Sequence, residues 1–295
     1  MDIWHNIKKT FGKANSLSRL IYINAIVFLV FLVFEIISFL FNNPDIEAAV
    51  LHLFAIPASL KTLLVRPWTL ITYMFTHKDI WHILFNMLWL YWFGKIFLDY
   101  LDQRKLVAIY FLGGISGAIV YVLSFNIFPA FTGMVHDSVA IGASASVMAI
   151  VISTAAYIPD YSINLFLLGR IRIKYIALAI FILTSFMDFS VNSGGKLAHM
   201  GGALFGLLYI LNLRKGKDIA KGFNRIIDFL ATLFKPRKKM KVSYKRPVTD
   251  YEYNKIKSDR QLKINQILDK ISKGGYDSLT KEEKEFLFSE SQKKN

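Results

Sequence analysis

Ser144 is the serine whose surroundings favour nucleophilic chemistry. It lies in the segment IGASAS, where Gly142 and the small residues after it allow the backbone to turn tightly just before a helix begins. The start of a helix presents unpaired backbone N–H groups, which can bind the oxyanion formed when a serine attacks a carbonyl. Taken alone, the serine is ambiguous, because a hydroxyl in an apolar helix often serves only packing or a local hydrogen bond.

His199 is the matching candidate for a general base. It lies in the segment AHMGGALFG, where small residues on both sides allow another helix to approach within hydrogen-bonding distance, as a Ser/His pair requires. A histidine inside an apolar run is costly and is therefore a candidate functional residue. The alternative is a packed imidazole that donates to a neighbouring carbonyl, and both interpretations stay open.

His82 and Asn86 form a third polar cluster. They are four residues apart, so on a helix they share one face. Two side-chain donors on one face could bind the oxyanion of a tetrahedral intermediate, or they could bridge the bundle to loop carbonyls. Ser146 is a rival nucleophile, but two residues along a helix its side chain points away from the face of Ser144.

Six apolar segments could position these residues. The chain is 54% hydrophobic and 15% aromatic, a composition typical of membrane proteins. A helix needs about 20 apolar residues to cross the hydrocarbon. The predicted spans are residues 21 to 41, 81 to 98, 106 to 126, 144 to 159, 173 to 189 and 198 to 213. Spans four and six are short and rich in small residues, which suits the middle of a bundle.

The distribution of Lys and Arg predicts the orientation of the spans. These residues concentrate before span one, between spans two and three, between spans four and five, and after span six. Both termini are therefore predicted to be cytoplasmic, in the cell inner (plasma) membrane. Spans two, four and six then all run from outside to inside. Their first turns, with His82, Asn86, Ser144 and His199, would share one depth and form a site towards the outer side.

Composition also excludes several classes of chemistry. The chain has no cysteine, which rules out disulfides, thiolate metal sites and a cysteine nucleophile. No cofactor and no metal site are predicted. The formal charge of +15 could indicate nucleic-acid binding, but the basic residues flank the spans or follow residue 213, where membrane topology explains them. No nucleic-acid partner is expected.

Four regions follow from these patterns. Residues 1 to 20 are a cytoplasmic N-terminal segment, and residues 21 to 213 form the six-span bundle. Residues 214 to 249 combine an amphipathic helix, suited to the membrane surface, with a polybasic linker suited to anionic headgroups. Residues 250 to 295 read as a small cytoplasmic helical hairpin with an unidentified cytoplasmic partner.

Taken together, the motifs resemble the rhomboid family of intramembrane serine proteases. HILFNMLWLYWFGK, GASAS and AHMGGALFG occur in this order, and the resemblance covers about residues 20 to 213. It implies an all-α membrane protein, a six-transmembrane-helix bundle with a short cytoplasmic helical tail. It also implies that Ser144 is the nucleophile and His199 the base of a catalytic dyad. His82 and Asn86 would then contribute to the oxyanion hole with the backbone N–H of Ser144.

The activity implied by this resemblance is that of a hydrolase, an intramembrane serine endopeptidase. It would cleave transmembrane segments of other membrane proteins, which are its predicted partners together with the lipid bilayer. The sequence departs from the family pattern at Ala145, where members often carry Gly, and at Met148, where an aromatic is common. One alternative is a catalytically inactive rhomboid-like module that binds membrane proteins. Another is a small transporter, whose site would lie near the midplane.

Overall fold

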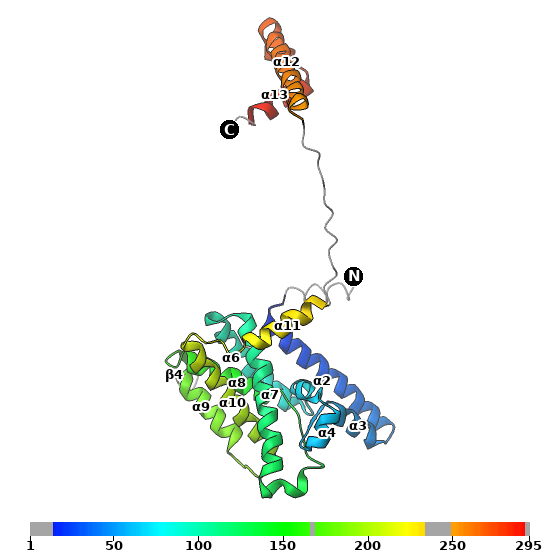
Figure 1. Cartoon of the computed structure of the whole chain (residues 1–295), viewed down its shortest axis with the longest axis vertical. Helices are drawn as coiled ribbons and strands as arrows, with labels where there is room; N and C mark the ends of the chain where they lie inside the picture. The colour runs from blue at the N-terminus through cyan, green and yellow to red at the C-terminus, as the bar shows by residue number, and fades with distance from the viewer. Residues whose placement is uncertain (1–13, 166–168, 234–248, 293–295) are drawn as a thin grey trace. The chain divides into compact units, whose positions relative to one another are not determined.

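The computed structural model describes residues 14–165, 169–233 and 249–292. They belong to two units, Met1–Lys235 and Pro236–Asn295, which are described separately. The first unit is a bundle of helices and the second is a helical hairpin (Figure 1). The polybasic linker predicted within residues 214 to 249 falls at residues 236 to 246, outside the described residues.

Six helices of the first unit occupy the six predicted spans. They are α2 (Ser16–Leu40), α6 (Ile80–Tyr100), α7 (Gln103–Ile127), α8 (Ser144–Tyr157), α9 (Ile173–Ser185) and α10 (Ser193–Arg214). By length and composition α2, α7 and α10 can each cross a membrane, and α8 and α9 are shorter apolar helices. The predicted all-α membrane bundle is therefore confirmed.

The start of α10 differs from the prediction. The helix begins at Ser193 rather than near residue 198, because Asn192 adopts a left-handed conformation and its side chain accepts a hydrogen bond from the N–H of Gly195. An asparagine tolerates this conformation and satisfies one of the free N–H groups of the first turn. As a result, His199 lies in the second turn of α10, whereas the prediction placed it in the first turn.

The long first loop is structured and contacts the segment before α8. It contains α3 (Pro44–Phe54), β1 (Ile56–Pro57), α4 (Leu60–Val65), α5 (Thr69–Thr72) and η1 (Tyr73–Phe75). Strand β1 pairs antiparallel with β2 (Val139–Ala140), so that Ile56 lies opposite Ala140. The N–H of Gly142 then donates to the carbonyl of Tyr73 at 2.9 Å. The first loop thus fixes the chain just before Ser144.

A second antiparallel pair joins α8 to α9 in the chain. It consists of β3 (Ser162–Leu165) and β4 (Gly169–Arg172). The carboxylate of Asp160 lies 2.9 Å from Lys174 and 3.3 Å from Arg172, and the hydrogen bond and charge of Lys174, with a smaller effect of Arg172, hold the pKa of Asp160 below its usual value. Both ion pairs are exposed, so they contribute little to stability.

Helices α8 and α10 are in backbone contact through glycines of α10. A methyl group on Gly202 would lie 2.1 Å from the carbonyl oxygen of Ala145, and one on Gly206 would lie 2.3 Å from that of Ala149. Close approach of this kind is typical of small-residue interfaces between membrane helices. The two helices that carry the candidate serine and histidine therefore have little freedom to shift against each other.

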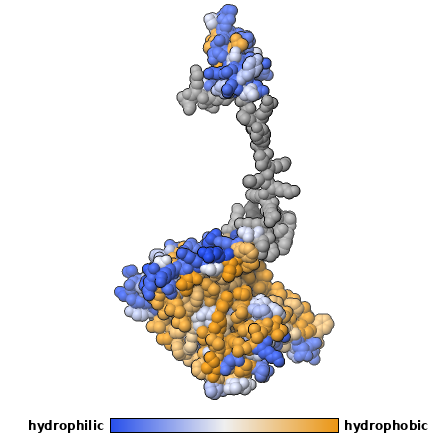
Figure 2. Space-filling view, in the orientation of Figure 1, coloured by the Kyte–Doolittle hydropathy of each residue, from blue (hydrophilic) through white to orange (hydrophobic). Residues whose placement is uncertain are grey.

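The outer surface of the bundle is apolar. Figure 2 shows broad apolar surface over the first unit, with polar residues gathered at its ends. Helix α2 is the clearest example, since only 11% of its most apolar window is buried and Phe39 is 83% exposed. Exposed apolar surface of this extent is stable only in contact with lipid, so the chain is a membrane protein.

Two further helical regions follow the bundle. Helix α11 (Lys221–Leu233) belongs to the first unit. The second unit contains α12 (Asp250–Gly274), η3 (Tyr276–Ser278) and α13 (Lys281–Gln292). Thr249 and Glu252 form a capping box at the start of α12, which satisfies free N–H groups there. An ion pair of 2.8 Å between Lys270 and Glu283 joins α12 to α13.

Candidate active site

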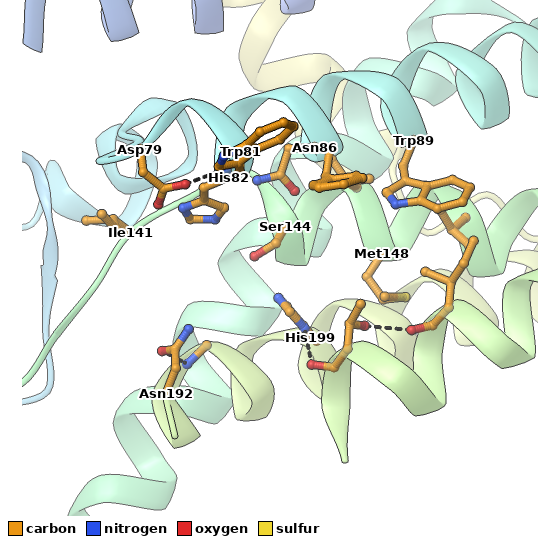
Figure 3. Close-up of a pocket in the computed structure, with 16 residues that line it drawn as sticks. Asp79, Trp81, His82, Asn86, Trp89, Ile141, Ser144, Met148, Asn192 and His199 are labelled. Atoms are coloured by element: carbon orange, nitrogen blue, oxygen red, sulfur yellow. Dashed lines mark hydrogen bonds between the residues drawn. The ribbon is translucent and has the colours of Figure 1, made fainter. Parts of the chain in front are cut away.

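A cavity of about 320 Å³ brings the four predicted site residues together. His82 and Asn86 reach it from α6, Ser144 from the start of α8, and His199 from α10 (Figure 3). The side chains come from segments up to 117 positions apart in the sequence, between His82 and His199. The cavity therefore exists only in the folded bundle.

Ser144 is the first residue of α8, and the turn before it depends on a glycine. Gly142 has φ +114°, a conformation that residues with a side chain rarely adopt. A methyl group there would also lie 2.7 Å from the ring of His82. Ala143, the N-cap residue, supplies no side-chain hydrogen bond. The N–H groups of the first turn are thus left for a ligand.

Ser146 is placed differently from Ser144. It is fully buried, and its hydroxyl has no hydrogen-bond partner among the described residues. A methyl group on Gly114 of α7 would lie 2.5 Å from this hydroxyl, so the side chain faces α7. The residues that line the cavity include Ser144 and not Ser146. The two-residue spacing on a helix had predicted that Ser146 points away from the face of Ser144.

The ring of His199 is oriented by a backbone carbonyl. Its Nδ1 lies 3.1 Å from the carbonyl oxygen of Thr184. A carbonyl oxygen only accepts, so Nδ1 carries the proton and Nε2 is left as an acceptor. Thr184 is the next-to-last residue of α9, where carbonyls lack partners within the helix. Figure 3 shows the His199 ring turned towards the side of the cavity where Ser144 lies.

His77 supports the other side of the site and was not found from the sequence. Its side chain is fully buried, and Nδ1 lies 3.3 Å from the carbonyl oxygen of Phe75, to which it donates. Its Nε2 therefore accepts, from the Asn86 amide at 3.1 Å and from the N–H of Ala143 at 3.3 Å. His77 precedes α6 in a segment without periodicity, so the only available signal was a second histidine close to His82.

Asn86 and His82 retain donors for the cavity. The Asn86 amide has two N–H groups, and the bond to His77 uses one of them. The backbone N–H of His82 donates to Asp79 at 2.7 Å, which caps α6. This cap leaves the imidazole of His82 free to lie beside the turn at Gly142. Both side chains therefore reach the region in front of Ser144.

The remaining walls of the cavity are apolar. They consist mainly of Trp81, Phe85, Trp89, Val147, Met148, Val151 and Ile180. Met148 lies one helical turn beyond Ser144 on α8. A cavity with apolar walls and a few convergent polar groups suits an apolar ligand that must be held at one polar bond.

No metal site is evident in the described part of the chain. Among residues 14–165, 169–233 and 249–292, no group of three His, Cys, Asp or Glu side chains is arranged to hold a metal ion. Asp79 is the one carboxylate that lines the described cavity, and it caps α6. The polar groups that line the cavity include two hydroxyls, two imidazoles, two amides and this one carboxylate, in addition to backbone N–H groups.

Comparison with known proteins adds independent information. A family model described as Rhomboid domain matches residues 65–216, which includes every residue of the cavity. A second model, described as a family of unknown function (DUF6576), matches residues 249–293. The second match covers the helical hairpin and assigns no activity to it.

Curated relatives carry rhomboid-like names. The chain is 29% identical over 143 residues to the Presenilin-associated rhomboid-like protein A, mitochondrial, of Danio rerio, covering 46% of this chain and 35% of that protein. It is 29% identical over 164 residues to the RHOMBOID-like protein 12, mitochondrial, of Arabidopsis thaliana, covering 52% of this chain and 48% of that protein. It is 27% identical to the Presenilin-associated rhomboid-like protein, mitochondrial, of Mus musculus, and this match covers 58% of this chain and 44% of that protein. The chain thus spans less than half the length of these relatives.

Proposed function

Because this chain belongs to the rhomboid family, we propose that it is a serine endopeptidase that cleaves transmembrane segments of other membrane proteins. Ser144 and His199 form the catalytic dyad in this proposal. The observation that supports it best is the placement of His199, whose Nδ1–H donates to Thr184 and whose Nε2 is left to accept a proton in the cavity of Ser144. A general base needs this tautomer and orientation.

The reaction proposed is acyl transfer to the serine. The Oγ of Ser144 attacks the substrate carbonyl as its proton passes to Nε2 of His199. The N–H of Ser144 and side-chain donors of His82 and Asn86 bind the oxyanion. His199 then gives the proton to the leaving amine, which breaks the C–N bond and leaves an ester on Ser144. Water, deprotonated by His199, hydrolyses the ester and restores the hydroxyl.

We place the substrate between α6 and α9. One side of the cavity carries Trp81, Phe85 and Trp89 of α6, and the other carries Ile180 and Thr184 of α9. Trp81 and Phe85 are 65% and 52% exposed, so they meet lipid as well as the cavity. An apolar segment arriving from the bilayer would exchange lipid contacts for contacts with these side chains. It must unwind locally, because a helical peptide bond is shielded by its neighbours.

The proposal includes a cell inner (plasma) membrane as the location, with both termini cytoplasmic and the site towards the outer side. The basic residues that flank the spans support this orientation. The curated relatives are named as mitochondrial proteins, so a mitochondrial membrane is the competing location. Fractionation of the source cells with an antibody to the hairpin decides between them, and protease access to the hairpin in sealed cells or organelles gives its side.

Activity-based labelling tests the proposed function. Purified protein in detergent is expected to react with a fluorophosphonate and to cleave a single-span substrate. Ser144→Ala should abolish labelling and lower cleavage on the order of 10⁴-fold or more. Ser146→Ala is the matched control and should retain both activities, because this hydroxyl faces α7. Absence of both activities in the wild type would instead favour an inactive rhomboid-like module that binds membrane proteins.

A further inference from the structure

Helix α11 has one apolar face that nothing in the described chain fully covers. Within Lys221–Leu233, the apolar side chains recur at helical spacing, whereas polar side chains occupy the opposite face. Ile226 is 60% exposed and Leu230 is 44% exposed. In water, an apolar face of this kind would be unfavourable on a helix that contacts the bundle mainly at one end.

Contacts with α7 fix which way this face points. The ring of Phe223 lies 6.0 Å from that of Phe111 on α7. Arg104, near the start of α7, lies 3.4 Å from Asp228 on the polar face of α11. Phe111 is eight residues beyond Gln103, so it lies about 12 Å further along α7 towards the membrane interior. The apolar face of α11 is therefore turned towards the hydrocarbon side and the polar face towards water.

The start of α11 is fixed as well. Asp218 accepts hydrogen bonds from the hydroxyl of Tyr209 on α10 at 3.2 Å and from the N–H of Ala220 at 2.9 Å. Figure 1 shows α11 running across the end of the bundle at which α7 begins. Figure 2 shows polar surface at this end and apolar surface below it. The helix thus lies at the boundary between the two.

We propose that α11 is an interfacial helix whose apolar face is covered by lipid of the leaflet at which α7 begins. Its pattern fits this role, since such helices combine a strongly amphipathic pattern with basic residues on the polar face. Lys221 and Arg225 have no ion-pair partner within the described ranges and are exposed, so they can meet lipid phosphates. Phe111 of α7 and Phe223 of α11 are partly buried and pack against each other, so the apolar face of α11 adjoins apolar side chains of the bundle on the membrane side of Arg104. Lipid is therefore the occupant that the contacts favour over a second protein.

The absence of cysteine makes this surface measurable in the full chain. Single cysteines are introduced at Ile226 or Leu230 on the apolar face, and at Arg225 or Thr232 on the polar face as matched controls. Each variant is labelled with an environment-sensitive fluorophore and placed in nanodiscs of phosphatidylcholine and phosphatidylglycerol, one copy per disc. Quenching is measured with lipids that carry a nitroxide on the acyl chain, and separately with aqueous iodide. Thermal unfolding of each variant checks that the bundle is intact.

Labels at positions 226 and 230 are expected to be quenched several-fold more by the nitroxide lipid than labels at positions 225 and 232. Iodide should show the opposite order. Equal access of iodide to all four positions would overturn the proposal, because α11 would then lie in water. Protection of positions 226 and 230 from both quenchers would also overturn it, because protein rather than lipid would cover the apolar face. The proposal does not depend on the protease activity.

Discussion

In the proposed dyad, the carbonyl of Thr184 would take the role that a carboxylate has in a Ser-His-Asp triad. It accepts the Nδ1–H of His199 at 3.1 Å and so selects the tautomer in which Nε2 can accept a proton. A neutral carbonyl stabilises the imidazolium less than a carboxylate does, because it carries no full charge. In the proposed mechanism the dyad depends more strongly on its oxyanion donors, and one of these, the Asn86 amide, is held by His77.

Removal of His77 should therefore slow the chemical step. His77→Phe leaves the Asn86 amide and the N–H of Ala143 without their shared acceptor, and each buried unpaired group costs about 1–3 kcal/mol. We expect a lower kcat with little change in KM, since the apolar walls that bind the substrate are unaltered. His77→Gln, which keeps an acceptor, should restore part of the rate.

His136→Phe is the matched control, because His136 is exposed and lies outside the cavity. Kinetics with a peptide substrate in detergent, together with unfolding temperatures, separates a catalytic from a purely structural effect. An equal loss of folded protein in His77→Phe and His77→Gln, with kcat per folded molecule unchanged, would contradict the positioning role.

At the scale of residues, the sequence indicated the side chains of the candidate site but not the groups that orient them. His199 and His82 stand out because ionisable residues inside apolar spans are rare, and Ser144 and Asn86 stand out through their predicted position at the same depth. His77 was missed because its importance comes from contact with Ala143, 66 positions later. The Thr184 carbonyl could not be predicted, since every residue has one and only the end of α9 leaves it unpaired.

At the scale of elements, close packing of α8 on α10 is the main constraint on the site. Gly202→Ala should lower the unfolding free energy by about 1–3 kcal/mol, because its methyl group would meet the carbonyl of Ala145 at 2.1 Å. Gly222→Ala, at an open position on α11, should instead raise stability by up to about 1 kcal/mol. Unfolding in mixed detergent measures both, and equal effects would contradict the packing account.

Proton binding to the hairpin gives a second prediction at this scale. The hydrogen bond from Lys270 and the capping bonds of Thr280 hold the pKa of Glu283 below its usual value. A carboxyl whose pKa is lowered by folding stabilises the folded state at pH values above its unfolded pKa of about 4.3. This contribution is lost as the pH falls through the folded pKa. The stabilising effect should therefore be present at pH 7 and fade below about pH 4.

Circular dichroism of a fragment spanning residues 249 to 292 measures this dependence. The difference in melting temperature between wild type and Glu283→Gln should shrink as the pH falls below 4. Glu282→Gln is the control, since Glu282 is exposed and forms no ion pair among the described contacts. A constant difference across the pH range would contradict the role of the Lys270 pair.

Element boundaries show where sequence patterns stop being informative. The apolar runs of the sequence indicated where all six span helices lie, although α8 and α9 are shorter than the length that the hydrocarbon requires of a single spanning helix. The start of α10 was predicted about five residues late, since the cap depends on a left-handed Asn192. The two-residue strands β1 and β2 form only because Ile56 meets Ala140 in the folded bundle.

At the scale of the whole molecule, the bundle should work without the hairpin. The residues that line the cavity all lie between Asp79 and His199, and the hairpin forms a separate unit. Deletion of residues 250 to 295 should leave fluorophosphonate labelling and cleavage of a generic single-span substrate unchanged. A truncation before residue 219 is the comparison, since it removes the contact of Phe223 with Phe111 and should lower thermal stability. A large rate change on deleting the hairpin alone would show that it regulates the site.

Composition and charge alone identified the membrane class, because 54% hydrophobic residues arranged in long runs leave few alternatives. They could not reveal that the hairpin matches a second family, or that α11 contacts α7. The order of the three sequence motifs then distinguished the rhomboid family from other membrane proteins of similar composition. The division of the chain into four regions remains a prediction from sequence.

The most direct test of the central claim is to locate the fluorophosphonate adduct by mass spectrometry. In the wild-type protein the adduct should be found on the peptide that contains Ser144, and its formation should be lost in His199→Ala, which removes the base. An adduct on Ser146 or another residue, or cleavage that persists in Ser144→Ala, would contradict the assignment of Ser144 and His199 as the catalytic dyad.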